Sequence, residues 1–342
     1  MSIQKRKKDH VELTVNEDVF YKKTTGFEQY DFVHNALPET ETDSVDLSGK
    51  LLGRSFDMPF FVSSMTGGYA DGESVNAKLA SFCEKMNLPL GVGSQRAMIE
   101  NPEETSSFSV VRKYAPSAFI AANIGGAQLI GGLPGKDVTR MINSIEADAV
   151  IVHLNPLQEL MQPEGDRNFK GIEEGIHRLI ETSEIPVIVK ETGAGLSADV
   201  AKRLLTAGVA VIDTAGAGGT SWAKVENLRQ KDGNALNHFN DWGIPTAESV
   251  QNIVVLRSDY DFELIASGGI RDAFDLVKAL ALGADFAAAA QPVIKSLMNS
   301  GEEGLETWYY ELKRDCKIIL TLLGCSAFGD LNSSHLRPVK SS

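Results

Sequence analysis

Cysteine is scarce in this sequence, and its spacing matches no metal or disulfide motif. The 342 residues include three cysteines, Cys83, Cys316 and Cys325, which lie far apart and form no Cys-x-x-Cys pair. Neither a disulfide framework nor a cysteine-ligated zinc site is therefore expected. A reducing, cytoplasmic setting fits this cysteine usage best.

Long apolar runs are also missing. No stretch of about 18 consecutive apolar residues occurs, so a membrane-spanning helix is not expected. Residues 5–8 are all Lys or Arg, but no apolar stretch follows them as it would in a secretory signal. The chain is 43% hydrophobic and 23% charged, which gives a globular protein ample material for a large core.

Positive charge is in short supply over the chain as a whole. The sequence has 33 Lys and Arg against 46 Asp and Glu, a formal net charge of −13, so nucleic acid is not an expected partner. The basic cluster at residues 5–8 stands out against this background. Two interpretations of it are open: a frayed, solvated terminus, or a clamp for a phosphorylated ligand.

What the sequence does contain is a regular alternation of strand-like and helical segments. Eight short apolar runs, most of them rich in β-branched or aromatic residues, have the pattern of strands buried on both faces. Between them lie segments with apolar residues at helical spacing, the last of which is followed by Gly283 as a helix stop. The strands are expected at 59–62, 89–92, 118–121, 149–152, 186–189, 209–212, 262–265 and 284–287, and the helices at 76–86, 138–145, 171–180, 197–205 and 273–282.

Eight strand–helix repeats predict an α/β protein with the (β/α)8 TIM barrel fold. A doubly wound sheet would usually have fewer strands and an early Gly-x-Gly-x-x-Gly turn, which is absent here. We expect an N-terminal extension over residues 1–55, packed against the barrel, then the barrel over 56–332 and a loose tail over 333–342. Residues 222–245 are expected to form a long insertion after the sixth strand, with a mobile loop or lid.

Polar residues follow nearly every expected strand. The fourth strand is followed by His153, Asn155, Gln158 and Glu159, at the end of the barrel where catalytic groups project. The fifth strand ends at Lys190, whose charge must face the barrel mouth to keep its hydration. Lys190 could form a Schiff base, bind a phosphate, stabilise an anionic ring or make a structural ion pair with Glu191.

A glycine-rich segment, residues 267–271, follows the seventh strand and predicts a phosphate site. Barrel enzymes commonly hold a phosphate at the loops after strands seven and eight, where backbone N–H groups surround it and glycine permits close approach. Arg271 adds a positive charge. Met65 and the alanines 287–290 offer small or soft surface on which a flat aromatic cofactor could lie, although core packing alone would also explain them.

These motifs together resemble the type 2 isopentenyl diphosphate isomerases, a family that uses FMN in a (β/α)8 barrel. The likeness runs from about residue 5 to about residue 330. It is carried by Arg6, Lys7 and His10, and by residues 65–68, 91–96, 122–125, 153–159, 162–165, 189–191, 218–220 and 267–271.

The resemblance implies reversible conversion of isopentenyl diphosphate into dimethylallyl diphosphate, a step of isoprenoid biosynthesis. Reduced FMN would act as acid and base without net redox change, with NADPH as the reductant and Mg²⁺ bridging to the diphosphate. A cytoplasmic homo-oligomer, a homotetramer or a dimer of tetramers, is implied as well, with a small-molecule substrate and no nucleic-acid or membrane partner.

The resemblance also assigns roles to individual residues. Gln158, His153 and Lys190 would take part in catalysis, and Glu159 would bind Mg²⁺. The substrate would lie among Arg6, Lys7, His10, Ser94, Gln95, Arg96, Asn155 and Gln158. FMN would be held by Ser64, Met65, Thr66, Ser94, Asn123, Lys190, Thr220, Gly269, Ile270, Arg271, Ala290 and Gln291.

Some roles stay open at this stage. Many relatives have Ser where this chain has Ala215, so a hydrogen bond to the flavin would be lost there. His153 and Glu159 are the side chains that could rival the flavin as acid, but His153 could equally be structural. Glu159 is better suited to Mg²⁺, which often takes one carboxylate together with substrate phosphates.

Three alternative functions are kept. A 2-hydroxy acid oxidase, also an FMN barrel, would need a histidine base after the seventh strand, and residues 267–271 contain none. A nucleotide dehydrogenase would need a catalytic cysteine after the sixth strand, and residues 216–220 contain none. A non-catalytic flavin-binding regulator is the third alternative.

Overall fold

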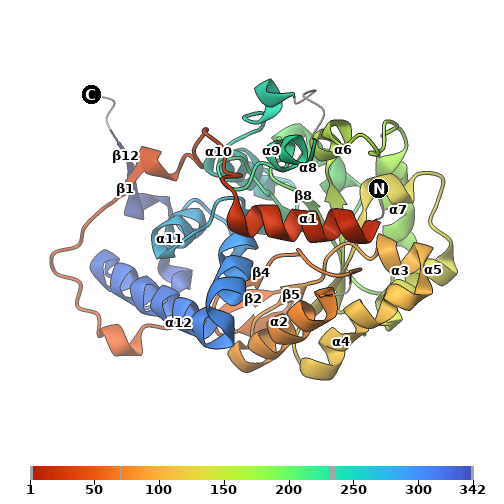
Figure 1. Ribbon diagram of the computed structural model, residues 1–342. Coiled ribbons are helices and arrows are strands. Elements are labelled where there is room, and N and C mark those ends of the chain that lie inside the picture. Colours follow the sequence, from red (N-terminus) through yellow and green to blue (C-terminus); the bar gives the residue numbers. More distant parts are fainter. Residues whose placement is uncertain (1–2, 70, 231–235, 340–342) are drawn as a thin grey trace.

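Eight parallel strands form a closed barrel at the centre of the computed structural model, which describes residues 3–69, 71–230 and 236–339 (Figure 1). Each strand pairs with the next along the chain, and β11 pairs with β4 to close the barrel. The expected TIM barrel and all eight expected strands are confirmed. The strands are β4 (Phe60–Val62), β5 (Leu90–Gly91), β6 (Ile120–Gly125), β7 (Ala149–Leu154), β8 (Val187–Glu191), β9 (Val211–Asp213), β10 (Glu263–Ser267) and β11 (Phe286–Ala289).

Helices surround the barrel, and the five predicted from periodicity all occur. Local sequence explains their limits: the Ser197 side chain caps α8 by accepting from Val200 N, Asp272 caps α11, and α11 ends just before Gly283. The α-helices that follow β4 are α2 (Gly72–Met86), α3 (Arg96–Glu100), α4 (Ser106–Tyr114), α5 (Gly135–Asn143), α6 (Pro156–Met161), α7 (Ile172–Thr182), α8 (Ala198–Thr206), α9 (Trp222–Arg229), α10 (Thr246–Val254), α11 (Ala273–Ala281) and α12 (Gln291–Leu323).

Short 3-10 helices connect many of these elements. They are η1 (Phe27–Gln29), η2 (Thr42–Ser44), η3 (Pro102–Thr105), η4 (Gly126–Leu129), η5 (Asn237–Phe239), η6 (Val255–Ser258), η7 (Phe328–Asp330) and η8 (Ser333–His335).

Side chains of each strand alternate between the barrel interior and the surrounding helices. On β7, Val150 and Val152 pack in the cluster shared with the helices, whereas Ala149 and Ile151 belong to the inner cluster. Because successive side chains point to opposite faces, His153 continues the inner series at the carboxyl end of the strand. The barrel therefore delivers His153 to the mouth.

A hairpin of β2 (Gly49–Leu51) and β3 (Arg54–Phe56) closes the opposite end of the barrel. Leu51 and Phe56 join the inner cluster, and the Phe56 ring contacts Phe119, just before β6, and Phe286, the first residue of β11. With that end filled by apolar side chains, the carboxyl ends of the strands are the side of the barrel on which the described residues leave room for a ligand.

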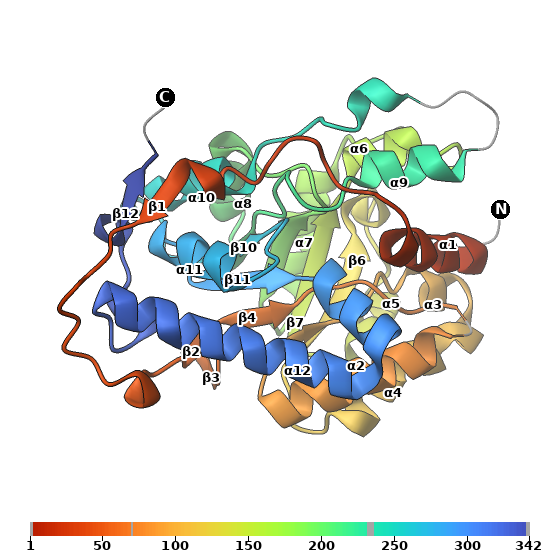
Figure 2. The same cartoon turned by 60° about the vertical axis from the view of Figure 1, so that its left-hand side comes forward.

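The N-terminal segment forms helix α1 (Ile3–Asn16), which lies beside α9 and α12 (Figures 1 and 2). Val11 and Thr14 on this helix are buried. A frayed, solvated terminus is thus the wrong interpretation of the basic cluster for the described residues. The helix gives residues 5–8 a fixed place above the barrel.

Two other expectations differ from the structure. The insertion at 222–245 begins as helix α9, because the Ser221 side chain caps it by accepting from Lys224 N, while residues 231–235 lie outside the described residues. The tail is not loose over 336–338: β12 (Leu336–Pro338) pairs antiparallel with β1 (Tyr30–Phe32), and Leu336 is buried. Within the described parts of the chain, no helix is both long and apolar enough to cross a membrane.

Candidate active site

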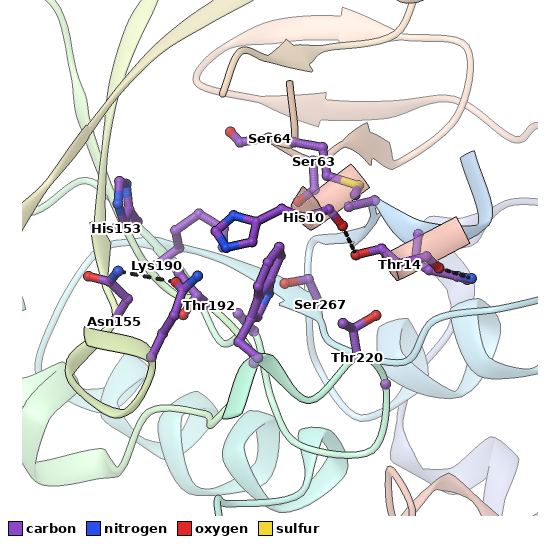
Figure 3. A pocket seen from close by; sticks show the side chains of 18 of the residues that line it. His10, Thr14, Ser63, Ser64, His153, Asn155, Lys190, Thr192, Thr220 and Ser267 are labelled. Carbon is purple, nitrogen blue, oxygen red and sulfur yellow. Dashed lines mark hydrogen bonds between the residues drawn. The ribbon is translucent and has the colours of Figure 1, made fainter. Parts of the chain in front are cut away.

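A cavity opens at the carboxyl ends of the barrel strands (Figure 3). Its walls come from the tips of all eight strands, and α1 covers one side with Arg6, Lys7, His10 and Thr14. Nearly all of the residues predicted from the sequence meet here. Those that line the cavity are Arg6, Lys7, His10, Ser64, Met65, Ser94, Arg96, Asn123, His153, Asn155, Gln158, Glu159, Lys190, Thr220, Gly269, Ile270, Arg271, Ala290 and Gln291.

Gln95 and Thr66 are the exceptions, and both are buried behind the cavity wall. Gln95 is 0% exposed; its Nε2 donates to the carbonyl of Met141 at 3.0 Å, and its Oε1 accepts from Asn123 N at 3.0 Å. The hydroxyl of Thr66 pairs with the side chain of Asn76 on α2. Gln95 therefore has no surface with which to contact a substrate, and both side chains support the wall from behind.

The loops after β9 and β10 form a backbone-lined corner of the cavity. Gly268 and Gly269 have φ angles of 99° and 75°, in the left-handed region that favours glycine. A Cβ on Gly219 would overlap the backbone nitrogen of Gly269, so the two loops touch backbone to backbone. Beside them α12 begins at Gln291. Glycine loops next to a helix N-terminus are suited to binding a phosphate.

Arg271 contributes less directly to this corner than the sequence indicated. Its guanidinium is paired with Asp275 on α11, with Nε 2.9 Å from Oδ2, and 59% of its side chain is exposed. It lies at the rim, where its charge would face a phosphate from the solvent side.

The wall next to this corner, called the soft wall below, is lined by small or flexible side chains, those of Met65, Ala288 and Ala289. The hydroxyl of Ser64 is buried, lies on the same wall and has no hydrogen-bond partner among the residues that the structure describes. A buried unpaired hydroxyl is costly unless a ligand satisfies it. This wall thus fits a flat ring with polar edges.

Lys190 lies in the cavity between two buried acids. It is the register partner of Asp213 on β9, and its Nζ donates to the backbone carbonyl of Glu191. Among the described side chains it forms no ion pair with Glu191, whose carboxylate instead accepts from the backbone N–H of Thr192 and Gly193 at 2.6 Å each. The structural ion pair considered from the sequence is therefore not formed.

His153 is neutral in this environment. Its Nδ1 lies 2.7 Å from Oδ1 of Asn123, whose Nδ2 donates to the carbonyl of Val92 at 2.9 Å. The amide is thereby oriented with its oxygen toward the imidazole, so Nδ1 carries the proton and Nε2 is an acceptor. Burial, with the charges of Lys190 and Lys7, lowers the pKa of His153 to about 3. As a proton donor near neutral pH, His153 is unsuited.

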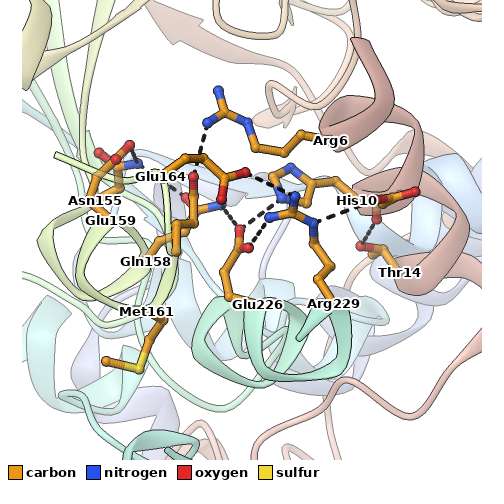
Figure 4. A network of polar contacts seen from close by, with 12 residues as sticks. Arg6, His10, Thr14, Asn155, Gln158, Glu159, Met161, Glu164, Glu226 and Arg229 are labelled. Carbon is orange, nitrogen blue, oxygen red and sulfur yellow. Dashed lines mark hydrogen bonds and ion pairs between the residues drawn. The ribbon is translucent and has the colours of Figure 1, made fainter. Parts of the chain in front are cut away.

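A buried carboxylate on α9, Glu226, joins three elements at the cavity mouth (Figure 4). Its Oε1 accepts from His10 Nε2 at 2.8 Å and from Gln158 Nε2 at 3.1 Å, and its other oxygen pairs with Arg229. Burial opposes ionisation, but the hydrogen bond from His10 and the charges of His10 and Arg229 outweigh it and lower the pKa of Glu226. Glu226 thus links α1, α6 and α9.

Sequence reasoning missed Glu226 and Trp222. Trp222 lines the cavity and packs edge-on against the His10 ring, with centroids 5.1 Å apart. The available signal was a carboxylate among the apolar positions of residues 222–229, a stretch that we expected to be a loop. Treating it as a helix would have placed Glu226 on a buried face.

Asn155, Gln158 and Glu159 form a connected group at the start of α6. Asn155 Nδ2 donates to Gln158 Oε1 at 3.2 Å and to Glu159 Oε1 at 3.0 Å, while Glu159 Oε2 accepts from Asp166 N at 2.8 Å. Nowhere in residues 3–69, 71–230 and 236–339 do three His, Cys, Asp or Glu side chains gather as a metal site. A cation at Glu159 would therefore take its other ligands from substrate or water.

Lys7 and Arg6 reach the cavity from α1. The Nζ of Lys7 donates to the carbonyls of Gly67 and Ser94 at 2.6 and 2.7 Å. Burial, together with the charge of Arg6, lowers the pKa of Lys7 to about 7. The same cavity is thus lined by cations from α1 and by the glycine corner, so one ligand with two anionic ends, or two ligands, would fit.

Comparison with known proteins agrees with this geometry. Residues 150–338 match the family model described as FMN-dependent dehydrogenase. An isopentenyl-diphosphate delta-isomerase from Chlorobium limicola is 43% identical over 97% of this chain and 95% of its own length. One from a Nostoc species is 44% identical over 98% of this chain and 94% of its own.

The chain belongs to the isopentenyl-diphosphate delta-isomerase family. The solved structures that it resembles share the fold at low identity. The flavin-binding domain of baker's yeast flavocytochrome b2 has a TM-score of 0.69 and 18% identity over 96% of this chain and 83% of that one. An active chimera of (S)-mandelate dehydrogenase has a TM-score of 0.66 and 16% identity over 97% and 91%. At such identities the likeness shows the fold alone, whereas the curated relatives support the isomerase family over the oxidase alternative.

Proposed function

We propose that this chain interconverts isopentenyl diphosphate and dimethylallyl diphosphate with FMN bound at the barrel mouth. The main support for this proposal is that the chain is 43–44% identical to isopentenyl-diphosphate delta-isomerases over nearly its whole length. The two-ended cavity supports it, because a glycine corner and a cationic side are what two phosphorylated ligands require. No observation favours a second function.

FMN would lie with its phosphate at the glycine corner and its ring on the soft wall. Gly269, Ile270 and Ala290 would offer backbone N–H groups to the phosphate, and Thr220 a hydroxyl. The unpaired hydroxyl of Ser64 and the cation of Lys190 would meet polar edges of the ring. Bound in its reduced form, FMN would supply the proton donor and acceptor of an allylic shift.

The substrate diphosphate would lie on the cationic side. Arg6, Lys7, His10 and Arg96 would offset its charge, which matters in a chain of net charge −13. Glu159 would add one carboxylate ligand for Mg²⁺, an ion that typically binds one or two carboxylates together with substrate phosphates. Asn155 would hold both Gln158 and Glu159 in place through the hydrogen bonds already described.

The protein's own side chains would shield and orient the reacting alkene. An alkene is a very weak base, so the cation that develops on protonation needs a site protected from water. α1 covers the mouth, and Trp222 with the His10 ring forms an aromatic wall over it. Neutral His153, held by Asn123, would add an acceptor at Nε2 without bringing a positive charge.

Further parts of the proposal rest on the sequence alone. NADPH would serve as the reductant that keeps FMN reduced, and the chain would assemble as a homotetramer or a pair of tetramers in the cytoplasm. Light scattering of the purified protein gives its mass and tests the assembly.

The deciding experiment is an anaerobic assay with purified protein, FMN, Mg²⁺ and isopentenyl diphosphate. After reduction with dithionite, dimethylallyl diphosphate should accumulate to equilibrium with no further consumption of reductant. NADPH should activate the enzyme in less than stoichiometric amount. Oxidation of one NADPH for each product formed would contradict the isomerase proposal, and flavin binding without turnover would favour a regulator.

A further inference from the structure

Residues 162–166, the segment that follows α6, have no assigned role, although part of it belongs to the motifs that carry the family likeness. Three of its polar side chains contact three different elements of the cavity mouth. Gln162 Oε1 accepts from Arg6 at 3.0 Å, and Glu164 Oε1 accepts from Arg229 at 3.2 Å. Asp166, the last of the three, connects to the proposed metal ligand.

Asp166 contacts Glu159 through its backbone. Its N–H donates to Glu159 Oε2 at 2.8 Å, while Asn155 holds Oε1 at 3.0 Å. Each carboxylate oxygen thus receives one N–H, which fixes the plane of the group and leaves lone pairs free for a cation. Gly165 permits this turn, since a Cβ there would overlap the backbone carbonyl of Glu159.

The carboxylate of Asp166 contacts two residues that line the cavity. Its Oδ2 accepts from Gln128 Nε2 at 3.2 Å and lies 3.6 Å from NH1 of Arg96. Arg96 has a second partner, Glu100, at 2.6 Å. Asp166 itself does not line the cavity, so any effect on a ligand must act through its neighbours.

We propose that Asp166 is a positioning residue, which arranges Glu159 through its backbone N–H and Arg96 and Gln128 through its carboxylate. The metal carboxylate and a diphosphate-binding cation are then set in place on one side of the cavity before substrate arrives. This inference rests on the proposed function and adds a residue and a role to it.

The charge of Asp166 gives the test a clear sign. If Asp166 only repelled the diphosphate, removing its charge in Asp166→Asn would lower KM for isopentenyl diphosphate. If it positions Arg96, the same change raises KM roughly two- to fivefold, the upper range for losing one partly exposed ion pair, while kcat stays within about twofold. The split between KM and kcat separates positioning from general damage, which would lower flavin content and kcat together.

The matched control is Asp148→Asn. The side chain of Asp148 is 35% exposed, against 40% for Asp166, and it also contacts an arginine, with Oδ2 3.3 Å from Arg112 NH2. Asp148 directly precedes β7, however, and so lies at the end of the barrel away from the cavity. It should leave KM unchanged. In an Arg96→Gln background, Asp166→Asn should raise KM much less than in the wild type, because the two residues act as a unit.

The outcomes separate the two proposals. A wild-type protein that does not isomerise overturns the proposed function. An active wild type with unchanged or lowered KM in Asp166→Asn, or with full additivity in the Arg96→Gln background, overturns only the positioning role. If Asp166→Asn does not fold, Asp166→Glu is measured instead; because its longer stem displaces the carboxylate, a raised KM supports the inference and an unchanged KM overturns it.

Discussion

The imidazole of His10 on α1 lies 2.8 Å from the fully buried carboxylate of Glu226 on α9. Residues far apart in the sequence are joined by this contact at the one open end of the barrel. Arg229 and Gln158 share the same carboxylate, so the helix that covers the cavity is attached to the two helices that follow β7 and β9. The N-terminal helix is thereby part of the site.

Glu226→Gln is expected to lower the free energy of unfolding at pH 7 by about 2–3 kcal/mol. Removing one partner of a buried ion pair costs ~3–5 kcal/mol. The loss expected here is at or below the lower end of that range, because Arg229 keeps its second ion pair, with Glu164 at 3.2 Å. The urea midpoint measures the change. Glu181→Gln, at an exposed pair with His177, is the control and should have no effect.

The effect of Glu226→Gln should also depend on pH. The pKa of Glu226 is lower in the folded protein than its ordinary value of 4.5, so its ionised form stabilises the fold above that pH. The difference between wild type and variant should therefore shrink as pH falls below 4.5. A difference that stays constant down to pH 3 would contradict the assignment.

Lys7 predicts a pH dependence of substrate binding. Its folded pKa is about 7 against an ordinary 10.5, so between these values the folded protein holds fewer protons than the unfolded chain and this group makes stability rise with pH. A diphosphate needs the cation, so KM should rise above pH 7, by up to about tenfold per pH unit.

Initial rates between pH 6 and 9 measure this dependence. Lys7→Gln should raise KM at pH 6 and flatten its rise above pH 7. Lys8→Gln is the control, because Lys8 is exposed and pairs only loosely with Glu12 at 3.7 Å; its profile should match the wild type. A wild-type KM that does not change from pH 7 to 9 would remove Lys7 from the binding site.

Glu159→Gln tests the proposed metal ligand. The amide keeps the shape of the side chain but loses the charge that Mg²⁺ requires, so the Mg²⁺ concentration for half-maximal activity should rise roughly tenfold or more. FMN content should stay normal, because Glu159 lies on the substrate side. Normal magnesium dependence in this variant would exclude the metal role, and exposed Glu174→Gln serves as the control.

Gly219→Ala tests the phosphate corner without touching the substrate side. The added Cβ would displace the backbone nitrogen of Gly269, so FMN affinity should fall at least about tenfold, the cost of one lost hydrogen bond to a charged group. Quenching of flavin fluorescence during titration measures it. Gly135→Ala, where a Cβ meets open space, should bind FMN as the wild type does.

The barrel could be predicted from the sequence because parallel strands buried on both faces leave continuous apolar runs such as 149–152. The polar residues that follow these runs predicted most of the cavity lining, since the carboxyl ends of all barrel strands meet in one place. Lys190 is an example: a cation directly after Val187, Ile188 and Val189 has only the mouth to face.

The other features of the fold and the site could not be predicted, because they depend on contacts between distant segments that the spacing of apolar residues does not encode. Gln95 sits in a motif of cavity residues, yet both ends of its amide bind the backbone of other segments. Glu226 was missed because its role arises from His10 and Arg229, one of which is more than two hundred residues away. The pairing of β12 with β1 likewise joins distant segments without a local signal.

That last pairing has a consequence for how the molecule is made. Tyr30 pairs with Pro338, which follows every barrel strand in the sequence, so the ladder cannot form until all barrel strands have been synthesised. Long sequence separation also makes its closure slow. Until then the edge of β1 that pairs with β12 stays open. Removal of residues 336–338 would leave that edge unpaired, and an unpaired strand edge can template aggregation.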